Sequence, residues 1–338
     1  MIQQVIATLA EGKPVSGQMV EQSVEEVLAG QATPAQIGAL LLGLRMAGET
    51  AEHLAAAARV TRAHAIAVLL PNSKGPILDT CGTGGDGHDT FNISTVSAIV
   101  LAACGVTVAK HGNRAASSRC GSADLLEALG INLDMPPAQV AACIEEVGVG
   151  FMFARSHHPA MRHAAPVRAE LGIRTIFNLL GPLANPAGAS HQLLGIGDAT
   201  KRALLAEVLI DLQIQRAWVV TGAEGLDEVS LSGPTQVTEI DAGKQRELEV
   251  VPEDFGLTRA PLSALVGGDI EHNRGIALDI LDGKAGPKRD AVVLNSAAAL
   301  CVTGLAQSPL QGAELAAAAL DSGRARQTLD RWVAFSRG

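Results

Sequence analysis

Apolar residues recur at helical spacing through the first seventy positions of the chain. They follow one another every three to four residues over 2–9 and again over 20–28, which is the pattern of a helix with one buried face. Gly12 and Gly30 come just after these two runs, where glycine commonly ends a helix. The pattern therefore predicts two short helices at the start of the chain.

Two more helices are predicted where a threonine precedes an apolar run. Thr33 is followed by Pro34, and Thr50 precedes "AEHLAAAARVTRAHA". Threonine is a good N-terminal cap and proline suits the first helical position. Four short helices without a strand indicate a small all-helical domain over about residues 1–70.

The pattern changes after the turn-rich segment "PNSKG" at 71–75. Residues 76–79 and 105–113 have the apolar character of strands, and an apolar run at 94–105 between them ends at Gly105. A strand, a helix and a second strand form a βαβ unit, whose two strands are parallel. This region therefore begins an α/β domain.

The alternation of predicted strands and helices continues as far as residue 304. Further strands are predicted at 149–154, 192–197 and 216–222, with helices at 136–148, 201–212, 273–283 and 290–304. Between 228 and 251 apolar and polar residues alternate around Gly243, which favours an antiparallel pair. The predicted fold class is α/β: a small N-terminal all-helical domain plus a larger α/β domain with a mostly parallel central sheet.

Composition narrows the possible partners and the location. The 338 residues carry a formal net charge of −9 and include two Trp, six Phe and no Tyr. No overall positive field attracts nucleic acid or an anionic membrane, so any anion site must be local. The five cysteines are odd in number and lack metal-type spacing, which indicates a reducing compartment. Without a signal peptide or membrane-length apolar run, we expect a cytoplasmic protein.

The glycine-rich stretch "LDTCGTGGDGHDTFNIST" at 78–95 is the first candidate site. Gly82, Gly84 and Gly87 match the G-x-G-x-x-G pattern of dinucleotide-binding proteins. Two features argue against that interpretation: "DGHDTFN" separates the glycines from the helix, and the next strand ends in Lys110 rather than in an acidic residue. The Walker pattern for nucleotide phosphates is also absent.

A phosphate site remains the better interpretation of this stretch. Its glycines would let backbone N–H groups approach a phosphate, and Asn92, Ser94 and Thr95 lie where a helix N-terminus favours an anion. Asp86 would repel a phosphate unless hydroxyls or a metal accompany it, so a sugar diphosphate with Mg²⁺ is expected. The structural alternative is a tight turn capped by Asn or Ser.

Two further segments place charge at predicted strand ends. "KHGNRAASSRCGSAD", from Lys110 to Asp124, would suit a loop closing over a polyphosphate; otherwise it is a solvated loop before a helix that Ser122 caps. Asp227 and Glu228 follow another strand, and Mg²⁺ prefers one or two carboxylates together with phosphate oxygens and water. Taken alone, such an acidic pair could equally be an ordinary surface feature.

The segment "HHPAMRHAAPVRAELGIRTIFNLLGPLANP" holds a fourth candidate. His157, His158 and His163 do not form a zinc motif. Arg168 lies on a predicted helix, where its guanidinium could bind a carboxylate through two hydrogen bonds or simply solvate the helix surface. The residues alone leave both roles open for Arg168.

Taken together, these motifs closely resemble the anthranilate phosphoribosyltransferase family, whose members join anthranilate to 5-phosphoribosyl 1-pyrophosphate (PRPP) in tryptophan biosynthesis. "GTGGD", "TFNIST", "KHGNR", "GSADLLEALG", "LDEVSLSGPT" and "GPKRDAVVLNSAAAL" occur in the family's order. The resemblance implies a helical domain of about 1–70 joined by helices from about 166–182, an α/β domain over 75–165 and 188–338, and a homodimer formed through the helical domains.

The resemblance also implies the roles of individual residues. Those expected to bind PRPP are Gly82, Gly85, Asp86, Thr90, Asn92, Ile93, Ser94, Thr95, Lys110, His111, Gly112, Asn113, Arg114, Ala115, Ala116, Ser117, Ser118 and Ser122. Those expected to contact anthranilate are Gly82, His111, Asn113, His158 and Arg168, with Arg168 binding its carboxylate. Ser94, Asp227 and Glu228 match Mg²⁺ ligands, for which two ions per active site are expected.

The sequence departs from the family pattern in the basic segment. Arg119 and Cys120 stand where Lys and Ser are common, and Ala115 and Ala116 replace Ser and Val. Asp89 adds a carboxylate that we expect to face solvent or a metal-bound water. No acid or base residue is assigned: Mg²⁺ and Lys110 are expected to stabilise the leaving diphosphate.

Two alternative functions are weighed against this one. A pyrimidine nucleoside phosphorylase has a similar architecture and phosphate loop, but it is usually longer and suits "KHGNR" and "FNLLGPLANP" less well. A non-catalytic, nucleic-acid-binding relative would need a basic surface, and this chain is acidic.

Overall fold

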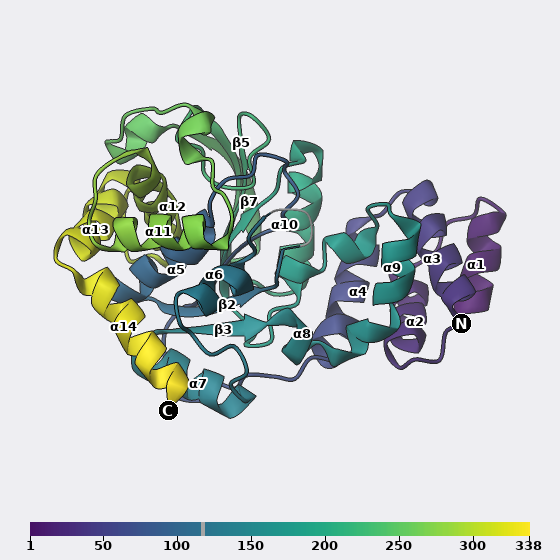
Figure 1. The fold of residues 1–338 in the computed structure, drawn as a ribbon. Helices are drawn as coiled ribbons and strands as arrows, with labels where there is room; N and C mark the ends of the chain where they lie inside the picture. The colour runs from purple at the N-terminus through teal and green to yellow at the C-terminus, as the bar shows by residue number, and fades with distance from the viewer. Residues whose placement is uncertain (116–118) are drawn as a thin grey trace.

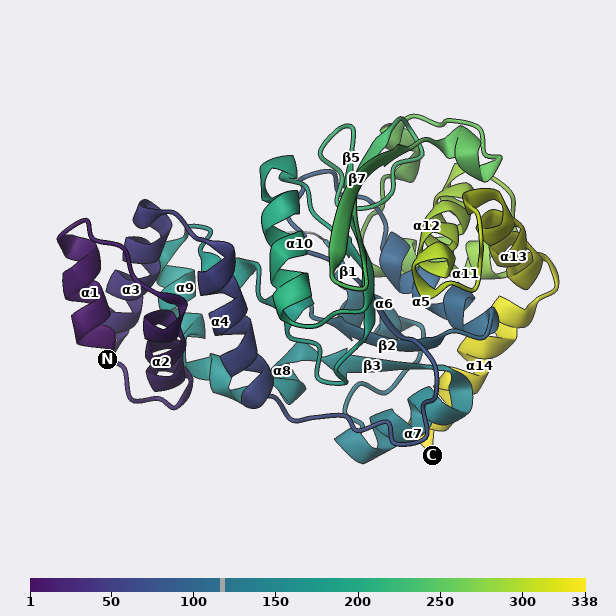
Figure 2. The same ribbon diagram turned by 180° about the vertical axis from the view of Figure 1, so that it is seen from behind.

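The protein folds into two lobes joined side by side (Figure 1). The computed structural model describes residues 1–115 and 119–338. The smaller lobe is helical and contains the N-terminus at its far end, whereas the larger lobe contains the sheet and the C-terminus (Figures 1 and 2). Residues 116–118, which include three predicted PRPP contacts, Ala116, Ser117 and Ser118, lie outside the described residues.

The four predicted N-terminal helices are confirmed. They are α1 (Ile2–Ala10), α2 (Gly17–Leu28), α3 (Pro34–Ala47) and α4 (Ala51–Ala63). Thr33 and Thr50 cap α3 and α4 by accepting hydrogen bonds from the backbone three residues later. Gly12 and Gly30 follow α1 and α2 with positive φ angles of 67° and 73°, a conformation that glycine adopts without strain.

A second segment of the chain completes the helical lobe. It contains the α-helices α8 (Ala154–His157) and α9 (Ala165–Leu171). It also contains three short 3-10 helices: η1 (Pro159–His163), η2 (Ile176–Asn178) and η3 (Gly181–Leu183). Val167, Ile176, Phe177 and Leu180 are buried in the same hydrophobic cluster as the N-terminal helices, and α9 packs beside α3 (Figures 1 and 2). The segment about 166–182 thus packs with the helices that open the chain.

The larger lobe is built on one seven-stranded sheet in the order β3-β2-β1-β4-β5-β6-β7. The strands are β1 (Ile77–Gly82), β2 (Thr107–Gly112), β3 (Val149–Phe153), β4 (His191–Gly195), β5 (Arg216–Gly222), β6 (Thr235–Asp241) and β7 (Lys244–Val250). The first five are parallel, and β6 and β7 extend the sheet with antiparallel pairing. The mostly parallel sheet and the predicted hairpin around Gly243 are both confirmed.

Helices cover both faces of this sheet. The helices of the larger lobe are α5 (Ile93–Ala103), α6 (Ser122–Ala128), α7 (Pro137–Val147), α10 (Arg202–Asp211), α11 (Ile270–Leu281), α12 (Pro287–Thr303), α13 (Pro309–Asp321) and α14 (Arg324–Arg337), with short turns η4 (Ala199–Lys201), η5 (Pro252–Phe255) and η6 (Leu262–Leu265). The sequence interpretation had not included α13 and α14. Among the described residues, no helix is long and apolar enough to cross a membrane.

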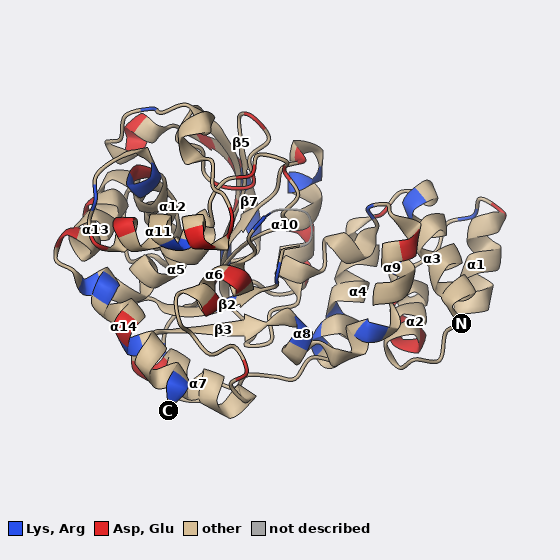
Figure 3. Cartoon of the chain, viewed as in Figure 1, with Lys and Arg blue, Asp and Glu red and all other residues tan. Residues whose placement is uncertain are grey.

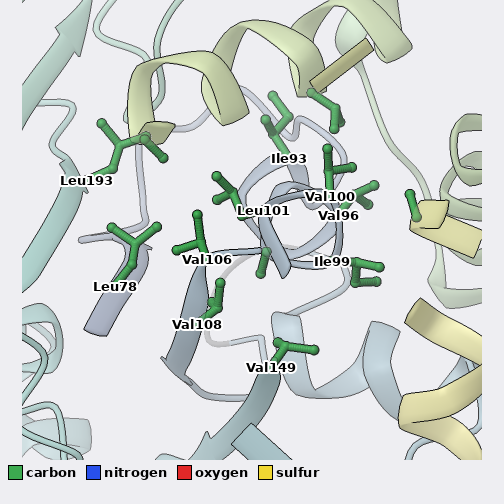
Figure 4. Close-up of a cluster of buried hydrophobic side chains, with 14 of the residues drawn as sticks. Leu78, Ile93, Val96, Ile99, Val100, Leu101, Val106, Val108, Val149 and Leu193 are labelled. Carbon is green, nitrogen blue, oxygen red and sulfur yellow. The ribbon is translucent and has the colours of Figure 1, made fainter. Parts of the chain in front are cut away.

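The two faces of the sheet belong to different hydrophobic clusters. Val96, Ile99 and Val100 of α5 lie among strand residues such as Val108 and Val149 (Figure 4), and α12 packs beside α5. The opposite face is covered by α10, which contacts α4 and so joins the sheet to the helical lobe. This arrangement holds the carboxyl ends of the parallel strands between the two lobes.

Candidate active site

Three loops that carry the predicted site residues start at one edge of the sheet. The glycine loop follows β1, the basic segment follows β2, and the acidic pair comes shortly after β5. Because these strands are parallel, their carboxyl ends lie at the same edge, where open α/β sheets bind ligands. Residues 143 positions apart in the sequence, Gly84 and Asp227, therefore meet here.

The acidic pair lies directly against the glycine loop. The Asp227 carboxylate accepts a hydrogen bond from the Gly84 amide at 2.8 Å, and the Asp227 amide donates to Asp86 Oδ2 at 3.4 Å. A β-carbon at Gly82 would collide with the Asp227 carboxylate, and one at Gly195 would collide with the Asp227 backbone. The absence of side chains at these glycines therefore permits the close approach.

Glu228 points to the N-terminus of α5 instead. Its Oε1 accepts a hydrogen bond from the Ser94 amide at 3.1 Å. The Lys110 ammonium donates to the Thr80 carbonyl and lies 3.4 Å from Ser94 Oγ, and only 2% of Lys110 is exposed. The three predicted metal ligands and Lys110 are thus brought together.

The electrostatics of this cluster favour a cation. Burial and the neighbouring Asp86 raise the pKa of Asp227, and burial and the adjacent Asp227 raise the pKa of Glu228. Both shifts reflect negative charges that are out of water and close to one another. No group of three or more His, Cys, Asp or Glu residues is placed to hold a metal within the described chain. A metal here would therefore need phosphate oxygens and water besides the carboxylates, as Mg²⁺ often does.

The strands β1 and β2 separate near the site. Their register runs only over Ile77↔Thr107 and Leu78↔Val108, whereas β1 stays paired with β4 as far as Gly82↔Gly195. Past Leu78 side chains replace the ladder: Asp79 accepts from the His111 amide at 3.1 Å, and Asn185 Nδ2 donates to both Ala109 O and Asp79 Oδ2 at 2.8 Å. The buried side chains of Asp79 and Asn185 therefore hold the end of β2, which carries Lys110 and His111.

The buried side chains of His111 and His158 form a neutral pair. Their ring centroids are 5.0 Å apart. His111 Nδ1 lies 3.0 Å from the Gly181 carbonyl, so it donates, and Nε2 is then an acceptor. That Nε2 is buried and has no hydrogen-bond partner among the described residues. Burial first, then the neighbouring His158, lowers the pKa of His111 to about 3. Burial first, then the adjacent His157, lowers the pKa of His158 to about 4.

Arg168 projects from α9 and is largely buried without a counter-ion. Its guanidinium lies 5.9 Å from the centre of the Phe177 ring, and burial lowers its pKa. No ion pair or side-chain hydrogen bond joins it to another described residue. Arg155, Arg162 and other basic residues also gather around α8 and the turn that follows, where the lobes meet (Figure 3). An acidic protein thus has a local surplus of cations at this junction.

The basic segment is tied back to α6. Arg114 forms ion pairs with Asp124 at 2.9 Å and Glu127 at 2.8 Å. Ser122 Oγ donates to the Asn113 carbonyl at 3.1 Å, and the N-cap of α6 is Gly121. The alternative in which Ser122 caps this helix is therefore wrong, because its hydroxyl is engaged with Asn113. Gly112 and Ala115 belong to the same described part of the segment.

The remaining residues predicted to bind PRPP differ in burial and in hydrogen bonding. Ile93 and Thr95 are 1% exposed, and their amides donate to the carbonyls of Phe91 and Asn92. Asn92 precedes α5 without capping it through its side chain; its Nδ2 donates to Cys120 O at 2.9 Å. Thr90 forms an isolated bridge with Val266, and Asp89 is exposed with a φ of 50°.

Several polar residues of the site region were missed by the sequence interpretation. They are Asp79, Arg174, Asn185, Asn273 and Asn295. Arg174, which follows α9, donates to the Gly85 carbonyl at 2.5 Å and so links the helical lobe to the glycine loop. An aspartate inside an apolar strand was a signal that could have identified Asp79. The asparagines lie in ordinary helical or turn sequence, which gives no such signal.

Comparison with known proteins agrees with this geometry. Residues 74–326 match the α/β domain of a glycosyl transferase family, and residues 3–65 match the helical bundle domain of that family. The anthranilate phosphoribosyltransferase of Parvibaculum lavamentivorans is 52% identical over 334 residues, which cover 99% of this chain and 97% of that protein.

Two solved structures share the whole fold. The crystal structure of anthranilate phosphoribosyltransferase from Thermus thermophilus is 46% identical, with a TM-score of 0.93 and 99% of both chains covered. The enzyme from Saccharomyces cerevisiae in complex with PRPP and Mg is 27% identical, with a TM-score of 0.92, 99% of this chain and 98% of that chain covered.

Proposed function

The chain belongs to the anthranilate phosphoribosyltransferase family, and we propose that it transfers the phosphoribosyl group of PRPP to the amine of anthranilate. The products are N-(5-phosphoribosyl)anthranilate and pyrophosphate. The protein is accordingly a glycosyltransferase of tryptophan biosynthesis. The observation that carries this function is the meeting of the glycine loop, Lys110 and the acidic pair at one sheet edge.

The residues of this edge suit the charges of the reaction. Breaking the bond between ribose C1 and the diphosphate leaves positive charge on the sugar and negative charge on the leaving group. We assign stabilisation of the leaving group to Lys110 and to the dipole at the N-terminus of α5, because fixed positive charge near a developing anion lowers the barrier. The amine of anthranilate is uncharged at neutral pH and can attack the sugar without a strong base.

We propose that Asp227, Glu228 and Ser94 bind Mg²⁺, which would neutralise the charge of the diphosphate. Burial and repulsion by neighbouring carboxylates raise the pKa of both carboxyls, and a bound cation would relieve this repulsion. Asp227 contacts the glycine loop, while Glu228 contacts the start of α5. Because the two carboxylates lie against different phosphate-binding elements, we infer two ions per site.

The part of the site around Arg168 and His111 suits anthranilate. We assign its carboxylate to Arg168, which has no carboxylate partner within the described chain. His111 Nε2 is a buried acceptor, and a substrate amine is a donor that would satisfy it. Gly82, Asn113 and His158 complete this proposed subsite.

The proposed reaction is tested by mixing the protein with anthranilate, PRPP and MgCl₂ and following the fluorescence of anthranilate. We expect the fluorescence to decay only when all three are present, and to stop decaying after excess EDTA is added. If fluorescence stays constant while thymidine or uridine is cleaved in the presence of phosphate, the protein is a pyrimidine nucleoside phosphorylase instead.

We propose further that two copies associate through a helical domain made of residues 1–70 and about 166–182. Ala35, Ala39, Leu42 and Met46 follow one another at helical spacing and are all exposed on α3. Met46 is 79% exposed and Leu42 is 43% exposed. An exposed apolar stripe of this kind commonly marks an interface between proteins.

We also propose a cytoplasmic location, supported by its cysteines. All five, at 81, 104, 120, 143 and 301, are free thiols in the fold, as is usual in a reducing compartment. Fractionation of producing cells with an antibody against the protein tests this, and recovery outside the cytoplasmic fraction would contradict it.

A further inference from the structure

Two buried asparagines on neighbouring helices reach the loops of the site without lying in them. Asn295 is on α12 and is 1% exposed, and Asn273 is on α11 and is 3% exposed. Each makes hydrogen bonds to a loop that comes from a distant part of the chain. Neither belongs to the proposed binding residues.

Asn295 holds the residue next to the acidic pair. Its Oδ1 accepts from the Val229 amide at 2.9 Å, and its Nδ2 donates to the Val229 carbonyl at 3.0 Å. Nδ2 also donates to Ala291 O, one turn earlier in α12, at 2.9 Å. The side-chain amide therefore pairs with both backbone groups of Val229, as a neighbouring strand would. This fixes the backbone immediately after Glu228 to a helix that is buried in the core.

Asn273 holds the start of α5 in a similar way. Its Oδ1 accepts from the Gly268 amide at 2.8 Å, and its Nδ2 donates to Asn92 Oδ1 at 3.0 Å. Asn92 in turn donates to Cys120 O at 2.9 Å. A short chain of side-chain amides thus connects α11 to the residue before α5 and to the basic segment. It is independent of the contacts of Asn295.

We propose that Asn295 and Asn273 are positioning residues of the active site, Asn295 for the metal-binding pair and Asn273 for the PRPP-binding start of α5. A buried amide that satisfies both groups of one backbone residue leaves that residue little freedom to shift. Residues that orient metal ligands typically change metal affinity 10- to 100-fold when they are replaced. The inference rests on the proposed function, since it assumes that Asp227 and Glu228 bind metal and that the start of α5 binds PRPP.

The test compares Asn295→Asp with Asn273→Asp. The two substitutions are the same chemical change in adjacent helices: the N–H donor is replaced by a second oxygen, and a carboxylate charge is added at a buried position. Ser296→Ala is the control, because Ser296 is fully buried beside Asn295 and its hydroxyl has no partner among the described residues. The affinity for Mn²⁺ is measured by electron paramagnetic resonance with saturating PRPP and no anthranilate. The KM for PRPP is measured at saturating Mg²⁺.

We expect Asn295→Asp to weaken Mn²⁺ binding about tenfold or more and to leave the KM for PRPP within about twofold. Asn273→Asp is expected to raise the KM for PRPP about tenfold and to leave Mn²⁺ binding within about twofold. Ser296→Ala should change neither quantity. Equal changes of both quantities in both variants, or a lower melting temperature with neither quantity changed, would show that the asparagines are only structural.

Two further measurements keep the test decisive. If Asn295→Asp does not fold, Asn295→Ser replaces it, and hydrogen exchange of the wild-type protein is measured as well. The Val229 amide should exchange as slowly as the amides of α12, although it lies in a loop; rapid exchange would overturn the role of Asn295. A wild-type protein that does not consume anthranilate would instead contradict the proposed function.

Discussion

Arg168 is the residue whose role depends most directly on a single interaction. Replacing it by Ala should raise the KM for anthranilate about thirtyfold, because a charge-assisted hydrogen bond contributes about 2 kcal/mol. The KM for PRPP should change much less. Steady-state kinetics with each substrate varied in turn measures both. Arg168→Lys, which keeps the charge but loses the planar fork, should lie in between; an unchanged anthranilate KM in Arg168→Ala would refute the assignment.

The acidic pair is tested at the same scale by removing its charge and keeping its shape. The double variant Asp227→Asn/Glu228→Gln should lower turnover at least about a hundredfold and raise the Mg²⁺ concentration needed for half activity. Glu271→Gln is the matched control, since that carboxylate is 78% exposed on α11. Wild-type kinetics in the double variant would rule out the metal assignment.

The buried histidines predict how stability depends on pH. Their pKa values in the folded protein, about 3 for His111 and about 4 for His158, lie below the unfolded value of about 6.5. At low pH the unfolded chain therefore binds protons that the folded protein excludes. Their stabilisation is complete above pH ~6.5 and is lost as pH falls toward those folded values. Each should cost about 2 kcal/mol at pH ~5.

Thermal unfolding at neutral pH and at pH ~5 checks this prediction. The variant His158→Asn should lose less stability between the two pH values than the wild type does. His272→Gln, a change at an exposed position of α11, is the control and should behave like the wild type. An identical loss in His158→Asn would show that His158 is charged in the folded protein.

At the scale of elements, the β6–β7 hairpin contains a local strain that can be removed. Its two-residue turn is Ala242–Gly243, with φ angles of 48° and 77°, as a type I′ turn requires. Alanine is strained at positive φ, whereas Asn tolerates it. Ala242→Asn should therefore stabilise the protein by about 1 kcal/mol, measured by urea unfolding. Ala242→Val should destabilise it; the reverse order would contradict the turn assignment.

The parallel strands show how elements create the site. Each strand was predictable from its own apolar run, and their carboxyl ends share one edge because they are parallel. The separation of β1 from β2 was not predictable in this way. It depends on Asn185, which is more than seventy residues from β2 and donates to Ala109 O and Asp79 Oδ2.

At the scale of the whole molecule, the apolar stripe on α3 predicts the oligomeric state. The double variant Leu42→Glu/Met46→Glu places two charges on this stripe and should convert a dimer into a folded monomer, as measured by analytical ultracentrifugation. Leu305→Glu is the matched control, because Leu305 is 46% exposed in the larger lobe, and it should leave the dimer intact. A double variant that stays dimeric would place the interface elsewhere.

The sequence by itself determined the elements and the residue types at the strand ends. Apolar periodicity, capping threonines and glycines act within a few residues. They therefore predicted α1 to α5, α7, α10, α11 and α12, the five parallel strands and the hairpin. Parallel strands require loops at a common edge, so the meeting of the glycine loop, Lys110 and Asp227 was expected as well. The resemblance to a known family then supplied the substrates, which no local pattern could identify.

Only the tertiary structure decided what holds these groups in place. It showed that Asp227 contacts the glycine loop whereas Glu228 contacts the start of α5. It also showed that Ser122 bonds Asn113 instead of capping α6, and that Arg174 links the helical lobe to Gly85. It also placed Asn273 and Asn295 behind the site. Such contacts join residues up to 181 positions apart, and they form only when the core packs, so no local propensity encodes them.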